Sequence, residues 1–413
     1  MKEKYSVLKE RKLVPFFVVW YLLVIALWLR FYQEEVEIIN TTSLAFNYSY
    51  GFVSRGFMGT IYSLVDMLLP INMIDYDCAV MFTLVATTIY MVVLFVFFST
   101  CLTKCNESMV KNTQYLVLFF TFFAVSMFIT KYNFGRYDVY CLMLSLIAAL
   151  LIIYEKAEWL VVPLSAIGVM IHQGNVFYFL NIILILLLYK AFSNEGKKRS
   201  KYLVLFGGSF VVASVLFLYF EFFSRGNGAA IVDEITDVAT ALRFDGDIHE
   251  DIIAHEVLGV DLTENEIEYR YKNFVEFPVF LLLMSPYLGM AFQFFKNLIK
   301  KAQTKLEKFK YLLVAVGVGT MIPTIILKCD FGRWMFMILA YYFVVILSLI
   351  AMKDKLVEQE VKNTMDKIRT LGPAAIIVFV YPLLFLPFKD VVISQVSYDI
   401  ADFINDNFLH LWK

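Results

Sequence analysis

Charged residues are scarce in this 413-residue sequence, at 18% of the chain, whereas hydrophobic residues make up 60% of it. A soluble domain has about 25% charged residues and at most about half apolar ones. The composition therefore excludes an ordinary water-soluble protein, and the mean hydropathy of +0.69 supports the same conclusion. Forty-one phenylalanines suit lipid-facing helices better than a water-facing surface, so we expect an integral membrane protein.

Cysteine is also scarce, with five residues and no CxxC pair. Cys101 and Cys105 are four residues apart with no histidine nearby, so a zinc site is not predicted and both are interpreted as small apolar residues. A Walker loop, a dinucleotide-binding glycine pattern and a GxSxG elbow are absent from the sequence. Nucleotide hydrolysis and serine-nucleophile chemistry therefore have no support, and no cofactor is predicted.

Long apolar runs are the main feature of the sequence. A spanning helix needs about 20 mostly apolar residues, and eleven runs reach or approach that length. They predict an all-α, polytopic fold with about eleven transmembrane helices, some of them short or re-entrant. No small-residue cleavage site precedes Arg30, so the first run is expected to be a retained anchor. The runs are 13–29, 79–102, 115–130, 139–154, 160–171, 176–189, 202–223, 275–295, 311–327, 334–352 and 372–388.

Lysine and arginine gather in every second connection between these runs. By the positive-inside rule those connections are cytoplasmic, which predicts a cytoplasmic N-terminus. The same rule predicts that segment 160–189 forms two helices rather than one. As a single helix it would put the basic stretches "GKKRSK" and "KNLIKK" on opposite sides of the membrane. Two short helices that meet at "HQGN" (172–175) keep all the basic connections on one side.

The chain is predicted to form a single transmembrane domain over 1–413. Residues 31–78 form a first outer loop with an interfacial or re-entrant segment, and 224–274 form an acidic outer loop. Apolar residues at helical intervals in that second loop predict amphipathic helices that cap an extracytoplasmic cavity. A C-terminal amphipathic tail is expected over 390–413.

The acidic loop contains histidines and carboxylates of the kind that bind metal ions, but the spacing of these residues argues against a metal site. His249 and His255 are six residues apart, whereas a HExxH motif places its histidines four apart to face one ion. The stretch "DGDIHED" also lacks the glycine placement and the twelfth-position glutamate of a calcium-binding loop. No metal site is therefore predicted.

Three arginines each adjoin a glycine at the predicted outer end of an apolar run. They are Arg55 in "SRGFMG", Arg136 in "FGRYD" and Arg333 in "DFGRW". A guanidinium presents five donors in a fork that fits phosphate oxygens, and the adjoining glycine lets a ligand approach the backbone closely. We predict that these arginines bind phosphate. The alternative is that they are outer-interface anchors whose stems lie along apolar surface.

Two aspartates accompany the arginines. Asp138 follows Arg136 by two residues, and Asp330 precedes Arg333 by three. Each could neutralise its arginine, because intramembrane charges are expected to be paired. The functional alternative is that Asp330 or Asp138 is a general base that takes a proton from a sugar hydroxyl.

His172 lies at the predicted break between two short helices, beside Gln173, Gly174 and Asn175. Polar groups at membrane depth tend to be functional, because the bilayer otherwise penalises them. His172 is therefore a candidate base or hydrogen-bond donor to substrate, and the alternative is a packed histidine. Gln173, beside His172, and Ser54, beside Arg55, are the remaining candidates for phosphate binding.

The layout of the chain, together with "SRGFMG", "FGRYD", "HQG" and "DFGRW", resembles two kinds of bacterial membrane enzyme that build surface polysaccharide. These are the repeat-unit polymerases of the Wzy type and the lipid-linked glycosyltransferases of the GT-C type. The latter commonly carry an acidic catalytic residue in the first outer loop. This sequence departs from that pattern, because the glutamates of its loop, Glu34, Glu35 and Glu37, lie close to the end of the first run.

The resemblance implies glycosyl transfer on the extracytoplasmic face of the cytoplasmic membrane of a bacterium. The donor would be a polyprenyl-(di)phosphate-linked sugar, the acceptor a glycan, and the product a surface polysaccharide repeat unit or polymer. Expected partners are those substrates, the lipid bilayer and other envelope-polysaccharide assembly proteins, with no nucleic acid. Two alternatives remain: a transporter or flippase of lipid-linked oligosaccharide that performs no chemistry, and a membrane acyltransferase.

Overall fold

The computed structural model describes residues 13–32, 36–69, 75–130, 133–224, 232–243, 277–327 and 331–380. Within these ranges every regular element is helical and no β-strand occurs, which confirms the predicted all-α class for the described part of the chain. Eight helical segments there are long and apolar enough to cross a membrane. They are Leu13–Arg30, Tyr76–Lys104, Glu107–Ile129, Tyr137–Tyr154, Gln173–Phe192, Gly196–Phe222, Lys305–Ile325 and Gly332–Ala351.

Three of the eleven predicted runs are not among these eight. Segment 160–171 forms only a short helix, α8 (Val161–Ile171). Segment 275–295 falls in α15 (Phe277–Lys301), a helix interrupted by Pro286 that is not one of the eight. Residues 381–388 of segment 372–388 lie outside the described residues, as do the predicted tail 390–413 and most of the loop 224–274.

Contacts divide the chain into two compact units. Unit 1 comprises Met1–Ile25, Cys101–Met127 and Asp261–Lys413, and unit 2 comprises Ala26–Thr100 and Phe128–Val260. The long helices α2 (Leu13–Phe31), α5 (Tyr76–Lys104) and α6 (Val110–Ile129) each pass a boundary between the units.

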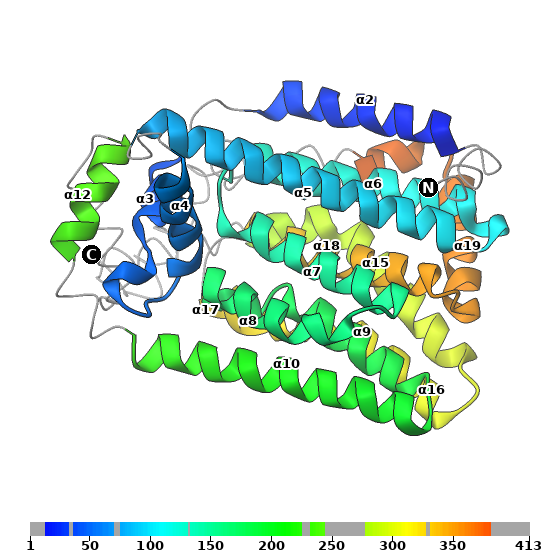
Figure 1. Ribbon diagram of the computed structural model, residues 1–413. Helices are drawn as coiled ribbons and strands as arrows, with labels where there is room; N and C mark the ends of the chain where they lie inside the picture. The colour runs from blue at the N-terminus through cyan, green and yellow to red at the C-terminus, as the bar shows by residue number, and fades with distance from the viewer. Residues whose placement is uncertain are drawn as a thin grey trace, which may run out of the picture. The chain divides into compact units, whose positions relative to one another are not determined.

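Unit 2 contains a bundle of four helices: α7 (Tyr137–Tyr154), α8, α9 (Leu180–Phe192) and α10 (Gly196–Phe222). α10 packs along both α8 and α9, and α7 packs on the other side of the same pair (Figure 1). α8 ends at Ile171 and α9 begins at Leu180, so the predicted division of the segment 160–189 into two helices is confirmed.

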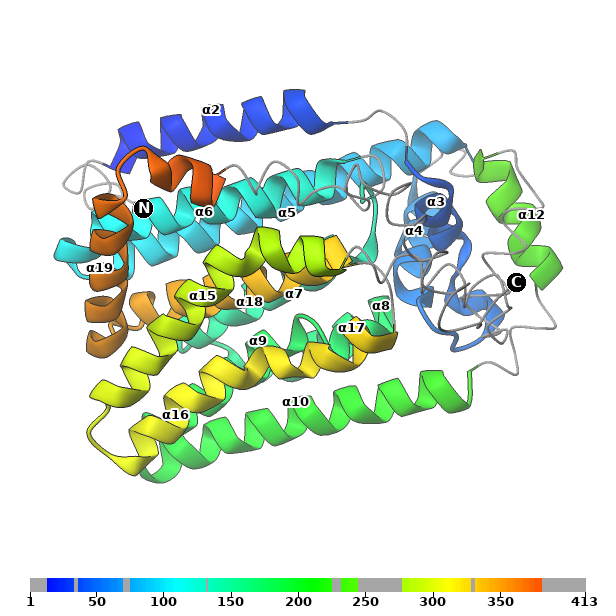
Figure 2. The ribbon, with the colours of Figure 1, turned by 180° about the vertical axis from the view of Figure 1, so that it is seen from behind.

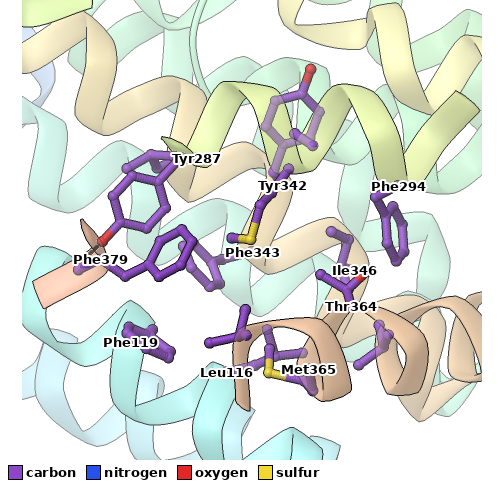
Figure 3. A pocket seen from close by; sticks show the side chains of 15 residues that line it. Leu116, Phe119, Tyr287, Phe294, Tyr342, Phe343, Ile346, Thr364, Met365 and Phe379 are labelled. Atoms are coloured by element: carbon purple, nitrogen blue, oxygen red, sulfur yellow. Dashed lines mark hydrogen bonds between the residues drawn. The ribbon is translucent and has the colours of Figure 1, made fainter. Parts of the chain in front are cut away.

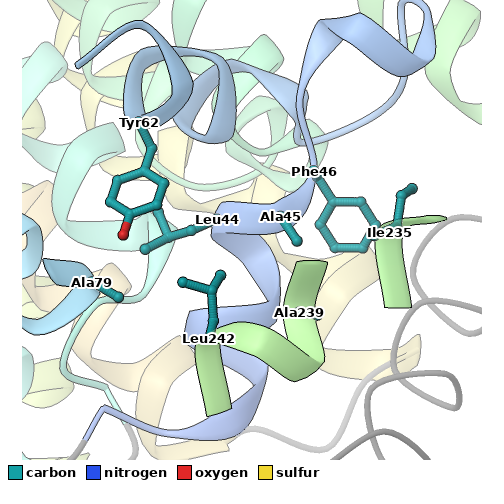
Figure 4. Close-up of a cluster of buried hydrophobic side chains, with 8 residues drawn as sticks. All are labelled: Leu44, Ala45, Phe46, Tyr62, Ala79, Ile235, Ala239 and Leu242. Atoms are coloured by element: carbon teal, nitrogen blue, oxygen red, sulfur yellow. The ribbon is translucent and has the colours of Figure 1, made fainter. Parts of the chain in front are cut away.

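The same unit contains short helices that pack at one end of α5. They are α3 (Ile38–Ala45), η1 (Tyr48–Tyr50), α4 (Gly56–Leu68) and α12 (Val232–Arg243). α12 is the amphipathic helix predicted in the acidic loop. Its acidic residues Asp233, Glu234 and Asp237 are exposed, and its apolar face is buried. Figure 4 shows that face against the other elements, in a cluster of Leu44, Ala45, Phe46, Tyr62, Ala79, Ile235, Ala239 and Leu242.

Gly59 lets α4 approach the chain that precedes it. A Cβ atom at Gly59 would lie 1.8 Å from the carbonyl oxygen of Phe46 and 2.7 Å from that of Leu44. Both neighbours are backbone atoms, so they cannot move aside as a side chain could. Only glycine fits at this position, and the close packing of α4 on residues 44–46 depends on it.

Unit 1 contains α15, α16 (Lys305–Val316), η7 (Gly317–Met321), α17 (Ile322–Leu327), α18 (Phe331–Ala351), α19 (Lys355–Thr370) and η8 (Ile376–Val380). α15 and α16 form a helical hairpin (Figure 2). Thr304 and Glu307 close a capping box at the start of α16, and Asp354 caps α19 by accepting from the backbone N–H groups of Leu356 and Val357.

α19 differs from the apolar helices because it is amphipathic. Val357, Val361 and Met365 are buried on one face. Glu360 is also buried and accepts hydrogen bonds from Asn297 and Lys301 of α15, both at 2.6 Å. These partners lower the pKa of Glu360 against the opposing effect of its burial, so the carboxylate is charged and paired at neutral pH.

A cluster of ion pairs joins the end of α7 to the beginning of α10 in unit 2. Glu155 binds Lys190 at 2.6 Å and Lys198 at 2.8 Å, and Glu158 binds Lys201 at 2.7 Å. The hydrogen bonds from Lys190 and Lys198 lower the pKa of Glu155 from 4.5 to about 2.

Replacing Gly59 by alanine is expected to destabilise the protein, because the new methyl group meets backbone that cannot yield. Overpacking of this kind costs about 1–3 kcal/mol, which thermal unfolding in detergent would detect as a lower Tm. Gly207→Ala in α10 is the matched control, since a Cβ there meets nothing within 4 Å. An unchanged Tm for Gly59→Ala would contradict the close approach of α4 to Phe46.

The contribution of Glu155 to stability is expected to depend on pH. Because folding lowers its pKa from 4.5 to about 2, the contribution is complete above pH 4.5 and is lost as the pH falls toward 2. Since the side chain is 36% exposed and water screens the pairs, Glu155→Gln should cost about 1 kcal/mol or less at pH 7.

The measurement is the Tm difference between the wild type and Glu155→Gln from pH 7 to pH 2.5. We expect that difference to shrink below pH 4.5. Glu195→Gln, an exposed carboxylate near the start of α10, is the control and should show no such trend. A difference that stays constant to pH 2.5 would argue against the ion pairs.

Candidate functional site

The turn before α4 carries Ser54, which is buried, and Arg55, which is half-buried. Arg55 has φ 62° and ψ 7°, in the left-handed region that non-glycine residues seldom adopt. Tyr137, the first residue of α7, secures this turn: its hydroxyl donates to the carbonyl of Ser43 at 2.9 Å and to that of Arg55 at 3.4 Å. A non-glycine residue held in such a conformation is typical of functional sites.

The glycines beside the arginines have a different role from the one we predicted. A Cβ at Gly56 would lie 2.6 Å from the ring of Tyr48, so a side chain of this protein, rather than a ligand, fills the space. Gly135 has φ +90°, which the turn before α7 requires. In both cases the glycine is explained by the local fold.

The break between α8 and α9 is organised around His172. Its backbone is extended, with φ −152° and ψ 114°, and its Nδ1 accepts a hydrogen bond from the backbone N–H of Gly174 at 2.9 Å. Since Nδ1 is an acceptor, the neutral ring carries its proton on Nε2. In this arrangement the Nε2–H group is the donor of the ring, and the predicted role of His172 toward a substrate stays a prediction.

Gln173 links three separate elements. Its side-chain oxygen accepts from the hydroxyl of Ser54, and its Nε2 donates to Oε1 of Glu221 at 2.9 Å. Ser54 lies before α4, Gln173 lies on η4 (Gln173–Val176), and Glu221 lies in the last turn of α10. Residues up to 167 positions apart in sequence thus form a single hydrogen-bonded chain.

Three of the four predicted motifs therefore meet in unit 2. "SRGFMG" contacts "HQG" through Ser54 and Gln173. "FGRYD" contacts both: the Tyr137 hydroxyl binds the carbonyl of Arg55, and the Tyr137 ring packs edge-on against the ring of His172, with centroids 5.9 Å apart. This convergence could not be read from the sequence spacing alone.

Arg136 and Asp138 flank Tyr137 at the beginning of α7. Arg136 occupies the N-cap position and is half-buried. Asp138 is only 3% exposed and lies in the first turn of the helix, where the helix dipole stabilises a negative charge. The phosphate-binding role of Arg136 and the catalytic role of Asp138 stay predictions.

The fourth motif belongs to unit 1. Arg333 lies in the first turn of α18, and its guanidinium carbon is 4.9 Å from the centroid of the buried Trp334 ring. This arrangement is a cation–π contact. Asp330 lies outside the described residues.

Glu221 is a candidate that our sequence analysis missed. It is the one carboxylate within the apolar run 202–223, and an ionisable residue inside such a run is itself a signal of a site. We read the run only as a spanning helix, and nothing in the sequence pointed to Gln173 as its partner.

Aromatic rings surround this part of unit 2. The Phe52 ring lies 5.4 Å from that of Tyr219 and 5.1 Å from that of Phe220, the two residues before Glu221. Phe217 and Phe177 pack edge to face at 5.4 Å. The chain from Ser54 to Glu221 is thus bordered by aromatic side chains.

Two buried polar atoms close in sequence to these motifs have no hydrogen-bond partner within the described part of the chain. They are the hydroxyl oxygen of Tyr48 and the side-chain oxygen of Asn175, which is 2% exposed. Burial raises the pKa of Tyr48, and the nearby Tyr137 adds to the effect, so the phenol stays protonated at neutral pH. Buried polar atoms without partners are rare, and an ordered water or a bound group can satisfy them.

A different hollow occurs in unit 1, with a cavity volume of about 90 Å³. It lies among α6, α15, α18, α19 and η8, and its lining is apolar and aromatic (Figure 3). Both of its tyrosines direct their hydroxyls to backbone carbonyls: Tyr287 donates to Phe379 and Tyr342 to Ala315. The hollow suits an apolar group and has no charged side chain, so we place the candidate site in unit 2.

No protein-family model, curated protein or solved structure matches this chain. The assignment of the candidate site therefore rests on the geometry of the described residues.

Removing the Gln173 amide is expected to weaken unit 2. Gln173→Leu keeps the size of the side chain but leaves Ser54 and Glu221 without their shared partner, at a cost of about 1–3 kcal/mol. Thermal unfolding measures the loss. Gln293→Leu is the control, because Gln293 is exposed and bonds only to Asn297 one turn away. Equal effects of the two substitutions would show that the Gln173 chain contributes no special stability.

Proposed function

We propose that this protein is a membrane glycosyltransferase that uses a polyprenyl-(di)phosphate-linked sugar as donor and a glycan as acceptor. The reaction would assemble or polymerise a surface polysaccharide repeat unit on the extracytoplasmic face of a bacterial cytoplasmic membrane. The observation that carries the proposal is the convergence of "SRGFMG", "FGRYD" and "HQG" in unit 2.

The groups at this place fit a phosphate-linked sugar. Arg55 and Arg136 flank the convergence and would bind the phosphate, whose negative charge grows as the sugar leaves. His172 would donate from Nε2 to a sugar or phosphate oxygen. The rings of Phe52 and Tyr219 offer apolar faces of the kind that pack against sugar rings, and the buried Phe220 packs against Phe52.

Placing the polar side chains of this site among apolar helices also costs free energy. A hydroxyl, an amide, a carboxylate and an imidazole meet there, and two further polar atoms are buried without partners in the described chain. A bilayer disfavours such a group of residues unless it serves a ligand. Phosphate binding by Arg333 and catalysis by Asp330 stay predictions from the sequence, and the proposed site in unit 2 does not depend on them.

The experiment is a transfer assay with the purified full-length protein in proteoliposomes that contain polyprenyl-diphosphate-linked sugar and a glycan acceptor. We expect release of lipid phosphate or diphosphate together with an extended glycan. Movement of the donor across the bilayer without transfer would show a transporter and would overturn the proposal.

Arginine-to-lysine substitutions test the phosphate sites. Lysine keeps the charge but loses the two-pronged geometry, so Arg55→Lys and Arg136→Lys should each reduce kcat/KM about 10- to 100-fold, the equivalent of one or two charge-assisted hydrogen bonds. Arg199→Lys, at an exposed position near the start of α10, is the control and should stay at the wild-type rate. Full activity in Arg55→Lys, Arg136→Lys and Arg333→Lys together would exclude phosphate binding by these arginines.

A further inference from the structure

Glu221 lies in the last turn of α10, next to Tyr219 and Phe220, whose rings contact Phe52. It is half-buried, whereas Asp138 is 3% exposed. We propose, on the basis of the function proposed above, that Glu221 is the general base that accepts the proton of the acceptor hydroxyl, and that Phe52 and Tyr219 form the platform for the acceptor sugar, with the buried Phe220 supporting Phe52.

The hydrogen bond from Gln173 favours this role. Gln173 Nε2 donates to Glu221 Oε1 at 2.9 Å, so the amide fixes the position of the carboxylate. Gln173 is itself held, because its oxygen accepts from the Ser54 hydroxyl. The carboxylate is therefore oriented by a partner whose own position is fixed, as a catalytic base requires.

The other groups at this place are less suited to accept a proton. His172 uses Nδ1 to accept from the N–H of Gly174 and carries its proton on Nε2. Ser54 directs its hydroxyl proton to Gln173. Burial keeps the Tyr48 phenol protonated by raising its pKa. Among the described residues of these three motifs and the end of α10, Glu221 combines a negative charge with partial exposure.

The aromatic residues give the carboxylate a matching surface. Phe52 is 37% exposed, and its ring is tilted by 41° to that of Tyr219 and by 40° to that of Phe220. Phe222 and Phe223 follow Glu221 and are more than two-thirds exposed, at 72% and 70%. A sugar whose apolar face lies on such rings presents its hydroxyls at the edge, within reach of a neighbouring carboxylate.

The proposed step balances as a single displacement. The acceptor hydroxyl oxygen forms a bond to the anomeric carbon of the donor sugar, and the bond from that carbon to the phosphate oxygen breaks. The electron pair leaves with the lipid (di)phosphate, near Arg55 and Arg136. The hydroxyl proton moves to the Glu221 carboxylate and is passed to water before the next turnover. One displacement inverts the configuration at the anomeric carbon.

The principal test is Glu221→Gln in the full-length protein in the transfer assay. Glutamine at 221 can still accept from Gln173 through its side-chain oxygen, so the fold should persist, but it cannot take a proton. We expect transfer to fall about 100- to 10,000-fold, the usual contribution of a general base. Binding of the lipid-linked donor should stay within threefold of the wild type. Glu195→Gln, at the other end of α10, is the matched control and should keep full activity.

Chemical rescue separates a base from a structural carboxylate. Glu221→Ala should regain part of its transfer activity when formate is added, and formate should not change the activity of the wild type or of Glu195→Gln. The new glycosidic bond, examined by NMR, should show inverted anomeric configuration.

The outcomes distinguish this inference from the function on which it rests. Wild-type activity in Glu221→Gln, or a product with retained configuration, would overturn the role of Glu221 and leave the glycosyltransferase proposal standing. A wild-type protein that makes no product would overturn the proposed function itself. Loss of donor binding and of transfer together in Glu221→Gln, without formate rescue of Glu221→Ala, would show that Glu221 acts only in the structure.

Discussion

The structure of unit 2 depends on the requirement that polar backbone at a break between apolar helices must find a partner inside the protein. Side chains meet that requirement at each break. His172 accepts from the N–H of Gly174, and the Tyr137 hydroxyl binds the carbonyls of Ser43 and Arg55. Asn40 donates to the carbonyl of Phe134 at 2.8 Å. Residues that satisfy the breaks therefore belong to the same segments as the candidate site.

The sequence predicted the helical class, the positions of most apolar helices, the break at "HQGN" and the amphipathic helix α12. These features follow from local properties: run length, the need for about 20 apolar residues to span a bilayer, and helical periodicity. The basic connections also indicated two helices between 160 and 189, and the structure contains α8 and α9 there. Local patterns were sufficient because each feature involves a single stretch of chain.

The site was less predictable because its contacts join distant segments. Sequence alone identified Ser54, Arg55, His172 and Gln173 but could not show that Ser54 and Gln173 are hydrogen-bonded. Sequence analysis missed Glu221 because its hydrogen-bond partner, Gln173, is 48 residues away. A lone carboxylate in an apolar run is nevertheless a sequence signal of a functional site. The prediction that Gly56 leaves space for a ligand was wrong for a related reason. The ring of Tyr48 fills that space, and this contact depends on the folded structure.

The direction of the hydrogen bonds bears on the choice between transfer and transport. From Ser54 to Gln173 to Glu221 each donor points toward the next acceptor, so the Glu221 carboxylate is the last acceptor of the chain. Movement of a lipid without chemistry does not by itself require a proton acceptor at this place, whereas the proposed transfer does. A transferase has to bind the anion at one point and withdraw a proton at another. In the proposed transferase, the carboxylate and the arginine-bearing turns, separated by the hydroxyl and the amide, would supply those two opposite requirements.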